Sequence, residues 1–150
     1  MFRLNRLTDY AVVVMSQMAT RQEATSTAAE ISRDTGVPLP TVAKVLNALA
    51  RDGLILSHRG ASGGYALSRP AEEIGVADII QAIEGPIALT ACVDGSTAHC
   101  DVEGLCPMRG GWDKVNEAIR QALDQVTLAD MVRPALAFED KAGAREQLHA

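Results

Sequence analysis

The sequence predicts a mainly α-helical fold, a winged helix-turn-helix with a small β-hairpin wing, followed by a long C-terminal dimerisation helix. Three observations predict it. Two amphipathic segments are joined by a short turn at residues 35–38, a glycine-rich segment at 59–63 separates two short apolar runs, and apolar residues recur at heptad spacing after residue 110. The 150 residues suffice for one domain with a hydrophobic core.

The first helix is expected to open near Thr8 and Asp9, because both side chains can cap a helix N-terminus. The apolar residues that follow at helical spacing are Ala11, Val12, Met15 and Met18. A polar stretch at residues 20–26 ends this helix.

Two further helices form the predicted helix-turn-helix. Thr27 and Glu30 have the spacing of a capping box, so a short helix begins there and stops before Gly36. Pro40 is suited to the first turn of the next helix, which ends before Gly53. The apolar face of that helix is expected to consist of Val42, Val45, Leu46 and Leu49.

The wing is predicted from residues 54–58 and 64–68, which have the character of short strands. The intervening residues 59–63 form the tip of the hairpin, since glycine tolerates a positive φ. Residues 1–70 are therefore expected to form the DNA-binding domain.

Residues 71–150 divide into four predicted parts. Residues 71–91 form a connecting helix and linker, in which Val76 to Ile83 is helical and Gly85-Pro86 stops the helix. Residues 92–109 form a cysteine-containing loop, 110–132 the dimerisation helix, and 133–150 a flexible tail.

An apolar seam marks the predicted dimerisation helix. Its members are Trp112, Val115, Ile119, Ala122 and Val126, spaced alternately three and four residues apart, with charged residues on either side. Thr127 is expected to cap a further turn. The seam either packs on its own domain or joins two chains, and we favour a homodimer because dimers recognise two half-sites.

The charge is distributed unevenly. The net charge of −5 alone argues against a nucleic-acid partner. However, residues 1–70 carry eight basic and five acidic side chains, and residues 71–150 carry six basic and fourteen acidic ones. A basic half and an acidic half indicate two different roles in one chain.

Double-stranded DNA is the predicted partner of the basic half. On the third helix, the candidate contacts off the apolar face are Thr41, Lys44, Asn47 and Arg51, and Arg59 stands at the tip of the wing. The alternatives are a protein-binding helix-turn-helix and, for Asn47, a merely solvated side chain.

Three cysteines, Cys92, Cys100 and Cys106, fall within one polar loop. Their C-x7-C-x5-C spacing lacks the C-x2-C pairs of zinc fingers, and thiolates are the preferred ligands of iron–sulfur clusters. The alternatives are a zinc site with His99 as a fourth ligand and a thiol redox switch without a cluster. A disulfide framework is not expected from an odd number of cysteines.

Other classes of protein are not indicated. The sequence shows no secretory signal and no run of about 20 apolar residues, so we expect a cytoplasmic protein without a membrane partner. It contains no phosphate-binding loop and no motif of a catalytic triad, so we expect neither an enzyme nor a small-molecule substrate.

Several segments resemble the winged-helix iron–sulfur regulators of the IscR/NsrR type, most closely the branch that regulates SUF-system iron–sulfur cluster assembly. They are residues 4–12, 39–46, 59–65, 76–80 and 84–89, together with the cysteine loop. The similarity extends over about residues 1–132. It implies a homodimeric regulator of palindromic operators, holding a [2Fe–2S] or [4Fe–4S] cluster on Cys92, Cys100 and Cys106.

The resemblance also implies a fourth cluster ligand. IscR-like members have a histidine where this chain has Arg109, whereas some NsrR-like members use an aspartate from the first helix of the partner, which Asp9 matches. Asp9 is the expected fourth ligand, and His99 and Asp101 are the alternatives. The other role considered for Asp9 is to cap the N-terminus of the first helix. The resemblance predicts a cluster-sensing repressor of cluster assembly genes, and the alternative is a zinc-dependent or thiol-redox repressor.

Overall fold

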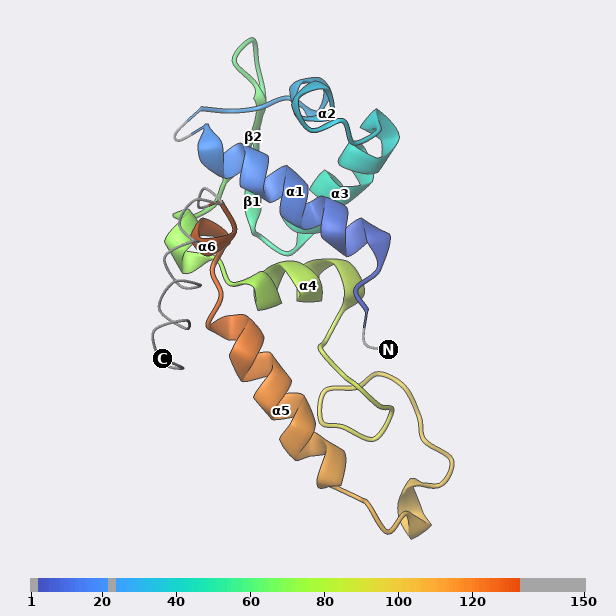
Figure 1. Ribbon diagram of the computed structural model, residues 1–150. Helices are drawn as coiled ribbons and strands as arrows, with labels where there is room; N and C mark the ends of the chain where they lie inside the picture. Colours follow the sequence, from blue (N-terminus) through green and yellow to red (C-terminus); the bar gives the residue numbers. More distant parts are fainter. Residues whose placement is uncertain (1–2, 22–23, 133–150) are drawn as a thin grey trace, which may run out of the picture.

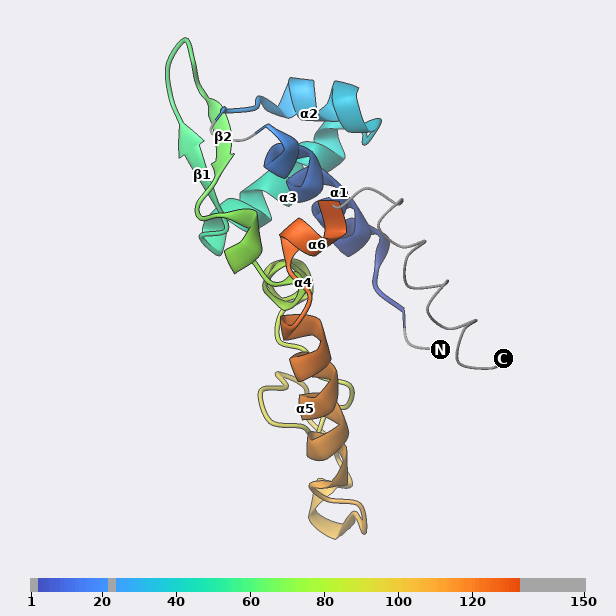
Figure 2. The same cartoon turned by 60° about the vertical axis from the view of Figure 1, so that its left-hand side comes forward.

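The computed structural model describes residues 3–21 and 24–132 (Figure 1). The helices are α1 Arg6–Thr20, α2 Ala28–Thr35, α3 Leu39–Arg51, α4 Val76–Glu84, α5 Gly111–Asp124 and α6 Leu128–Val132, and the strands are β1 Ile55–His58 and β2 Gly64–Leu67. All of these elements except α5 form a head, from which α5 projects (Figure 2). The mainly helical fold with a small hairpin wing is confirmed.

Helix α1 begins earlier than the sequence predicts. Its N-cap is Asn5, whose Oδ1 accepts a hydrogen bond from the Thr8 backbone N–H at 2.8 Å. Thr8 is instead buried in the first turn, where its hydroxyl donates to Oε1 of Glu84 at 2.5 Å. Thr8 and Asp9 are therefore not the cap, and the capping role considered for Asp9 is wrong.

The helix-turn-helix follows the predicted local signals. Both hydrogen bonds of the Thr27–Glu30 capping box are present, and the Thr27 backbone N–H and hydroxyl hold the pKa of the Glu30 carboxyl below its ordinary value. Gly36, with φ 76°, ends α2 in the left-handed conformation. Helix α3 then begins at Leu39, with Pro40 in its first turn.

A single apolar core holds the head together. The predicted face of α3, formed by Val42, Val45, Leu46 and Leu49, is fully buried against the apolar side of α1. Ile79 from α4 and Leu128 from α6 extend the same core. Burial of these aliphatic side chains is the main force that fixes α3 relative to the rest of the head.

The wing is anchored to the head by backbone hydrogen bonds. Strands β1 and β2 are antiparallel, with Ile55 opposite Leu67 and His58 opposite Gly64. The segment before α2 adds a bridge on the other side of β2, because Ser26 and Tyr65 exchange two backbone hydrogen bonds of 2.9 and 2.8 Å. The wing is thus held along β2 as well as at its base.

The predicted helix at 110–132 is two helices in the structure. Helix α5 ends at Asp124, and the following turn pairs with the start of α4, where Val76 N donates to Val126 O and Leu128 N donates to Ile74 O. Thr127 caps α6, as expected, and α6 packs on α1.

The tail predicted at 133–150 lies outside the described residues. No helix within 3–21 and 24–132 is long and apolar enough to cross a membrane.

The backbone contact at Gly64 gives the first prediction. Gly64 has φ +147°, and a Cβ there would lie 2.7 Å from the Ser26 carbonyl oxygen. We expect Gly64→Ala to lower the free energy of unfolding by about 2–3 kcal/mol, measured by urea denaturation. Gly60→Ala is the matched control, since Gly60 has φ +111° but open space around it, and should cost about 1 kcal/mol. Equal losses in the two variants would contradict the close-approach explanation.

Candidate functional site

The predicted DNA contacts lie on the exposed side of α3 and at the tip of the wing. Lys44, Asn47, Arg51 and Arg59 are exposed, and Thr41 is half-buried. The wing tip projects beyond the helices of the head (Figures 1 and 2). Helix α3 buries one face and presents the other, as a helix that enters a major groove must.

The basic side chains of this half differ in whether they have acidic partners. Arg21 and Arg33 both contact Asp34, at 2.6 and 3.2 Å, and Arg69 contacts Asp78 at 2.9 Å. Within residues 3–21 and 24–132, by contrast, Lys44, Arg51 and Arg59 form no ion pair. Their charge is therefore available to neutralise phosphates.

Two glycines let the wing fold tightly, one of them for a reason that the sequence alone does not show. A Cβ on Gly63 would lie 2.7 Å from the carbonyl oxygens of His58 and Gly60, inside the hairpin. Gly64 is constrained by Ser26, as described above. The Thr25 hydroxyl also donates to the Ser62 carbonyl at 2.8 Å. The wing tip is thus tied to the segment that leads into α2.

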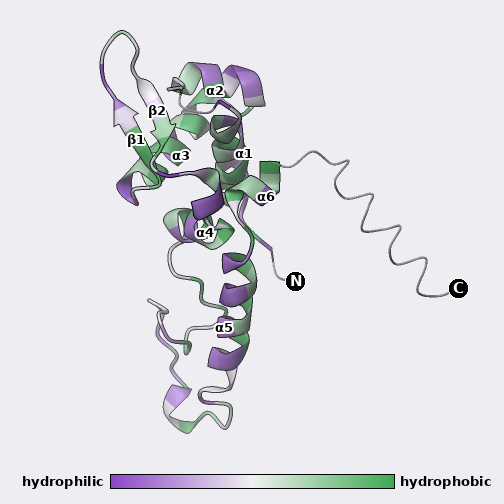
Figure 3. Cartoon of the chain, turned by 90° about the vertical axis from the view of Figure 1, so that its left-hand side faces the viewer, coloured by the Kyte–Doolittle hydropathy of each residue, from purple (hydrophilic) through white to green (hydrophobic). Residues whose placement is uncertain are grey.

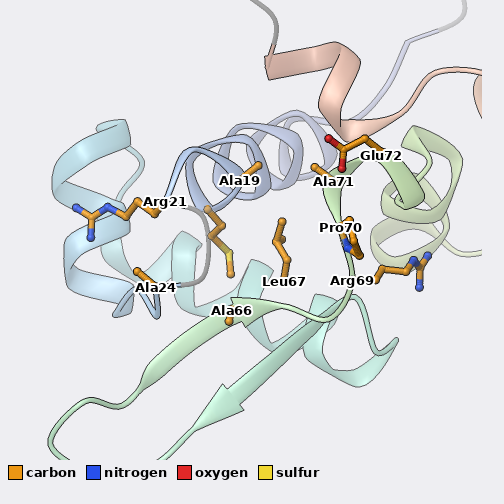
Figure 4. A pocket seen from close by; sticks show the side chains of 10 residues that line it. Ala19, Arg21, Ala24, Ala66, Leu67, Arg69, Pro70, Ala71 and Glu72 are labelled. Atoms are coloured by element: carbon orange, nitrogen blue, oxygen red, sulfur yellow. The ribbon is translucent and has the colours of Figure 1, made fainter.

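A pocket of about 420 Å³ lies between the wing and α1 (Figure 4). Its lining is largely apolar, including Met18, Leu67 and Pro70. Its two arginines, Arg21 and Arg69, point away from one another, and each already binds an aspartate. The pocket therefore offers mainly an apolar surface, because the guanidinium groups of both arginines are paired with aspartates.

In the structure the cysteine loop extends over residues 85–110, from the end of α4 to the start of α5, and it runs alongside the distal part of α5 (Figures 1 and 2). Cys92, Cys100 and Cys106 are half-buried free thiols, and Cys106 directly follows a 3-10 turn at Glu103–Leu105. The Thr90 hydroxyl lies 3.3 Å from Sγ of Cys92. Three thiols are thus accessible within one loop.

The donor types suit an iron–sulfur cluster, since thiolates are its usual ligands. The part of the chain that the structure describes nevertheless contains no set of three His, Cys, Asp or Glu side chains close enough to hold one metal ion. Asp9 is exposed on α1, and His99 and Asp101 are exposed in the loop, with 3.8 Å between Nε2 and Oδ1. The donor set fits the cluster by chemistry, but the described residues of one chain do not bring it together.

The seam of α5 is largely uncovered. Trp112, Val115 and Val126 are 38%, 43% and 37% exposed, and Ile119 is half-buried. Figure 3 shows hydrophobic residues along one edge of α5 and hydrophilic ones along the other. Four of the five seam residues are thus exposed, and the described part of the chain leaves the seam largely uncovered. Val126 lies two residues beyond the end of α5.

Three polar residues that the sequence did not single out hold residues 84–94, which we call the root of the cysteine loop. Glu84 joins it to α1 by accepting from Thr8 Oγ1 and from the Asn5 backbone N–H. Asp113 and Asn116 join it to α5. Glu84 begins one of the segments that carry the family resemblance, but no motif assigns this role to any of the three. Only the position of Asn116 next to the apolar seam could have suggested burial.

Comparison with known proteins places this architecture in a family. A model named Rrf2, described as an iron-dependent transcriptional regulator, matches residues 4–134. The chain belongs to the Rrf2 family. It is thus a transcriptional regulator of a DNA-binding family, as the recognition helix and wing predicted.

Individual relatives agree with the Rrf2 assignment. A helix-turn-helix transcriptional regulator of Mycobacterium tuberculosis (strain ATCC 25618 / H37Rv) is 32% identical over 143 residues, covering 89% of this chain and 83% of the relative. The solved structure of CymR, the global cysteine regulator of B. subtilis, is 26% identical with a TM-score of 0.69 and covers 88% of this chain and 97% of that one. IscR of T. potens is 29% identical with a TM-score of 0.65, covering 87% and 86%. The likeness to IscR does not specify the SUF branch.

The unpaired cations of this Rrf2 protein give the second prediction. Because phosphate contacts are independent of sequence, a duplex of mixed sequence is a sufficient probe. We expect Lys44→Gln and Arg59→Gln each to weaken binding and to reduce the slope of log K against log salt by about 1. Arg120→Gln on α5 is the control and should change neither. Unchanged affinity and slope in both variants would place the DNA elsewhere.

Proposed function

We propose that this protein is a homodimeric repressor that senses an iron–sulfur cluster and controls the genes for cluster assembly. The observation that carries the proposal is the position of the three cysteines, in one loop whose root is hydrogen-bonded both to the DNA-binding head and to α5. A change in this loop would therefore act directly on the head, which carries α3, and on α5, which would join the two copies. These two parts determine how the protein binds its operator.

The homodimer is supported by the uncovered seam. An apolar stripe of this kind, flanked by the charged side chains of Lys114, Glu117 and Arg120, is typical of a helix that pairs with a second copy. Two copies would present two α3 helices to two half-sites, and the distance between the half-sites would then add specificity.

The cluster would be held by Cys92, Cys100 and Cys106, with a fourth ligand from Asp9 of the second copy, or from His99 or Asp101. When bound, the cluster would make the protein responsive to iron, oxygen or reactive nitrogen, because each of these would alter the cluster or its ligands. The chain's own residues supply the connection to DNA. Glu84 ties the loop to the first turn of α1, and the apolar core joins α1 to α3.

A thiol switch without a cluster is the second candidate, and two observations favour it. One chain does not gather the three thiols into a metal site within its described residues. The similar protein CymR is a cysteine regulator, and S. aureus CymR, 26% identical, has been solved in an oxidised form. The three half-buried thiols here could equally respond by oxidation.

Anaerobic purification distinguishes these candidates and is the third prediction. We expect a coloured protein that contains iron and acid-labile sulfide, because three thiolates in one loop favour a cluster. We expect Cys92→Ser, Cys100→Ser and Cys106→Ser each to lose most of the colour.

A colourless protein with one zinc per chain would contradict the cluster. A colourless and metal-free protein whose DNA affinity changes on oxidation of its thiols would instead establish the second candidate.

A further inference from the structure

Helix α5 has an unusual pattern of burial. Of its 14 residues, the one that is buried is polar: Asn116 is 4% exposed. A buried amide must find hydrogen-bond partners, because leaving it unsatisfied costs free energy. The hydrogen-bond partners of Asn116 therefore identify the segment that is attached to α5.

Both ends of the Asn116 amide bind the backbone at the start of the cysteine loop. Its Nδ2 donates to the Ile87 carbonyl at 2.9 Å, and its Oδ1 accepts from the Leu89 N–H at 2.9 Å. A carboxamide can donate to a carbonyl through its nitrogen and accept from an N–H through its oxygen at the same time. Both polar atoms of the Asn116 amide are thus used to hold residues 87–89.

One turn earlier on α5, Asp113 makes a third bond of the same kind. Its Oδ1 accepts from the Asp94 backbone N–H at 2.9 Å. Positions 113 and 116 are neighbours on one face of the helix. We call these two residues and their three bonds the α5 clamp.

Cys92 lies between the two points at which the α5 clamp grips the loop. Leu89 is held three residues before it and Asp94 two residues after it, and the neighbouring Val93 is 5% exposed. Cys100 and Cys106 lie farther along the loop, and in residues 24–132 no side chain of α5 is bonded to the backbone of 97–109. Of the three thiols, Cys92 is the one fixed to α5.

We propose that Asn116 and Asp113 are positioning residues that fix Cys92 against α5, so that a change at this thiol shifts α5 relative to the head. This inference rests on the proposed role of the cysteine loop as the sensor. The three cysteines then have different roles, and Cys92 is the one through which a chemical change in the loop reaches α5.

The first test measures thiol reactivity in the full chain without any metal. Timed alkylation with iodoacetamide, mapped by mass spectrometry, gives a separate rate for each cysteine. We expect Asn116→Ala to raise the rate at Cys92 about tenfold relative to Cys100 and Cys106, because loss of the clamp opens its segment locally. Gln121→Ala is the matched control, since the Gln121 amide is exposed and bonds only to Glu117 among the described residues.

Asp113 keeps this test decisive if Asn116→Ala does not fold. Asp113→Ala removes one bond and should raise the Cys92 rate, whereas Asp113→Asn keeps an acceptor oxygen and should restore it. An unchanged ratio of the three rates, or an equal rise at all three cysteines, would show that these residues merely stabilise the fold and would overturn the proposal.

The second test separates this inference from the proposed function. DNA affinity is measured before and after alkylation, in the wild type and in Asn116→Ala. We expect alkylation to change affinity in the wild type and to change it much less in the variant. No change in the wild type would contradict the sensor role of the loop. An equal change in both proteins would overturn the α5 clamp as the connection, while leaving the sensor role intact.

Discussion

Within the described residues, helix α5 buries no apolar side chain completely, so its position depends on polar contacts with the loop and with the start of α4. Its apolar seam is exposed, and its buried residue is an asparagine. What secures it is polar: the bonds of Asn116 and Asp113 to the loop, and the backbone bonds that join residues 126 and 128 to the start of α4. Hydrogen bonds each contribute modestly, so the position of α5 can respond to the state of the loop.

The head has the opposite character. Its helices share one fully buried aliphatic core, and its wing is fastened by two backbone bonds between Ser26 and Tyr65. Close-packed interiors of this kind transmit displacement instead of absorbing it. Glu84 is where the two parts meet, since it ends α4, precedes the loop and binds the buried Thr8 of α1. A shift at the loop root would therefore reach α3 through a rigid body.

Local signals in the sequence were enough for most of the fold. The Thr27–Glu30 capping box, Pro40 and the hairpin glycines each determine structure within a few residues, so the helix-turn-helix and wing could be predicted. The start of α1 was missed although its signal is local, since Asn5 is a preferred N-cap residue and accepts from the Thr8 N–H three residues later. The break after Asp124 could not be predicted, because the turn before α6 bonds to Ile74 and Val76, far along the chain. The α5 clamp escaped prediction for the same reason. The exposed side of α3 was predictable from periodicity. The spacing of the cysteines did not determine their arrangement, and the described residues bring no three metal-ligating side chains together.

The central claim is that the exposed seam of α5 is completed by a second copy of the chain. Sedimentation equilibrium at micromolar concentration tests it directly, with Ile119→Glu placing a charge in the seam and Gln121→Glu placing the same charge on the opposite side of the helix. The account predicts a wild type and a Gln121→Glu variant at about twice the chain mass of 15.9 kDa, and an Ile119→Glu variant at the mass of one chain. A monomeric wild type, or an Ile119→Glu variant that remains fully dimeric, would contradict it.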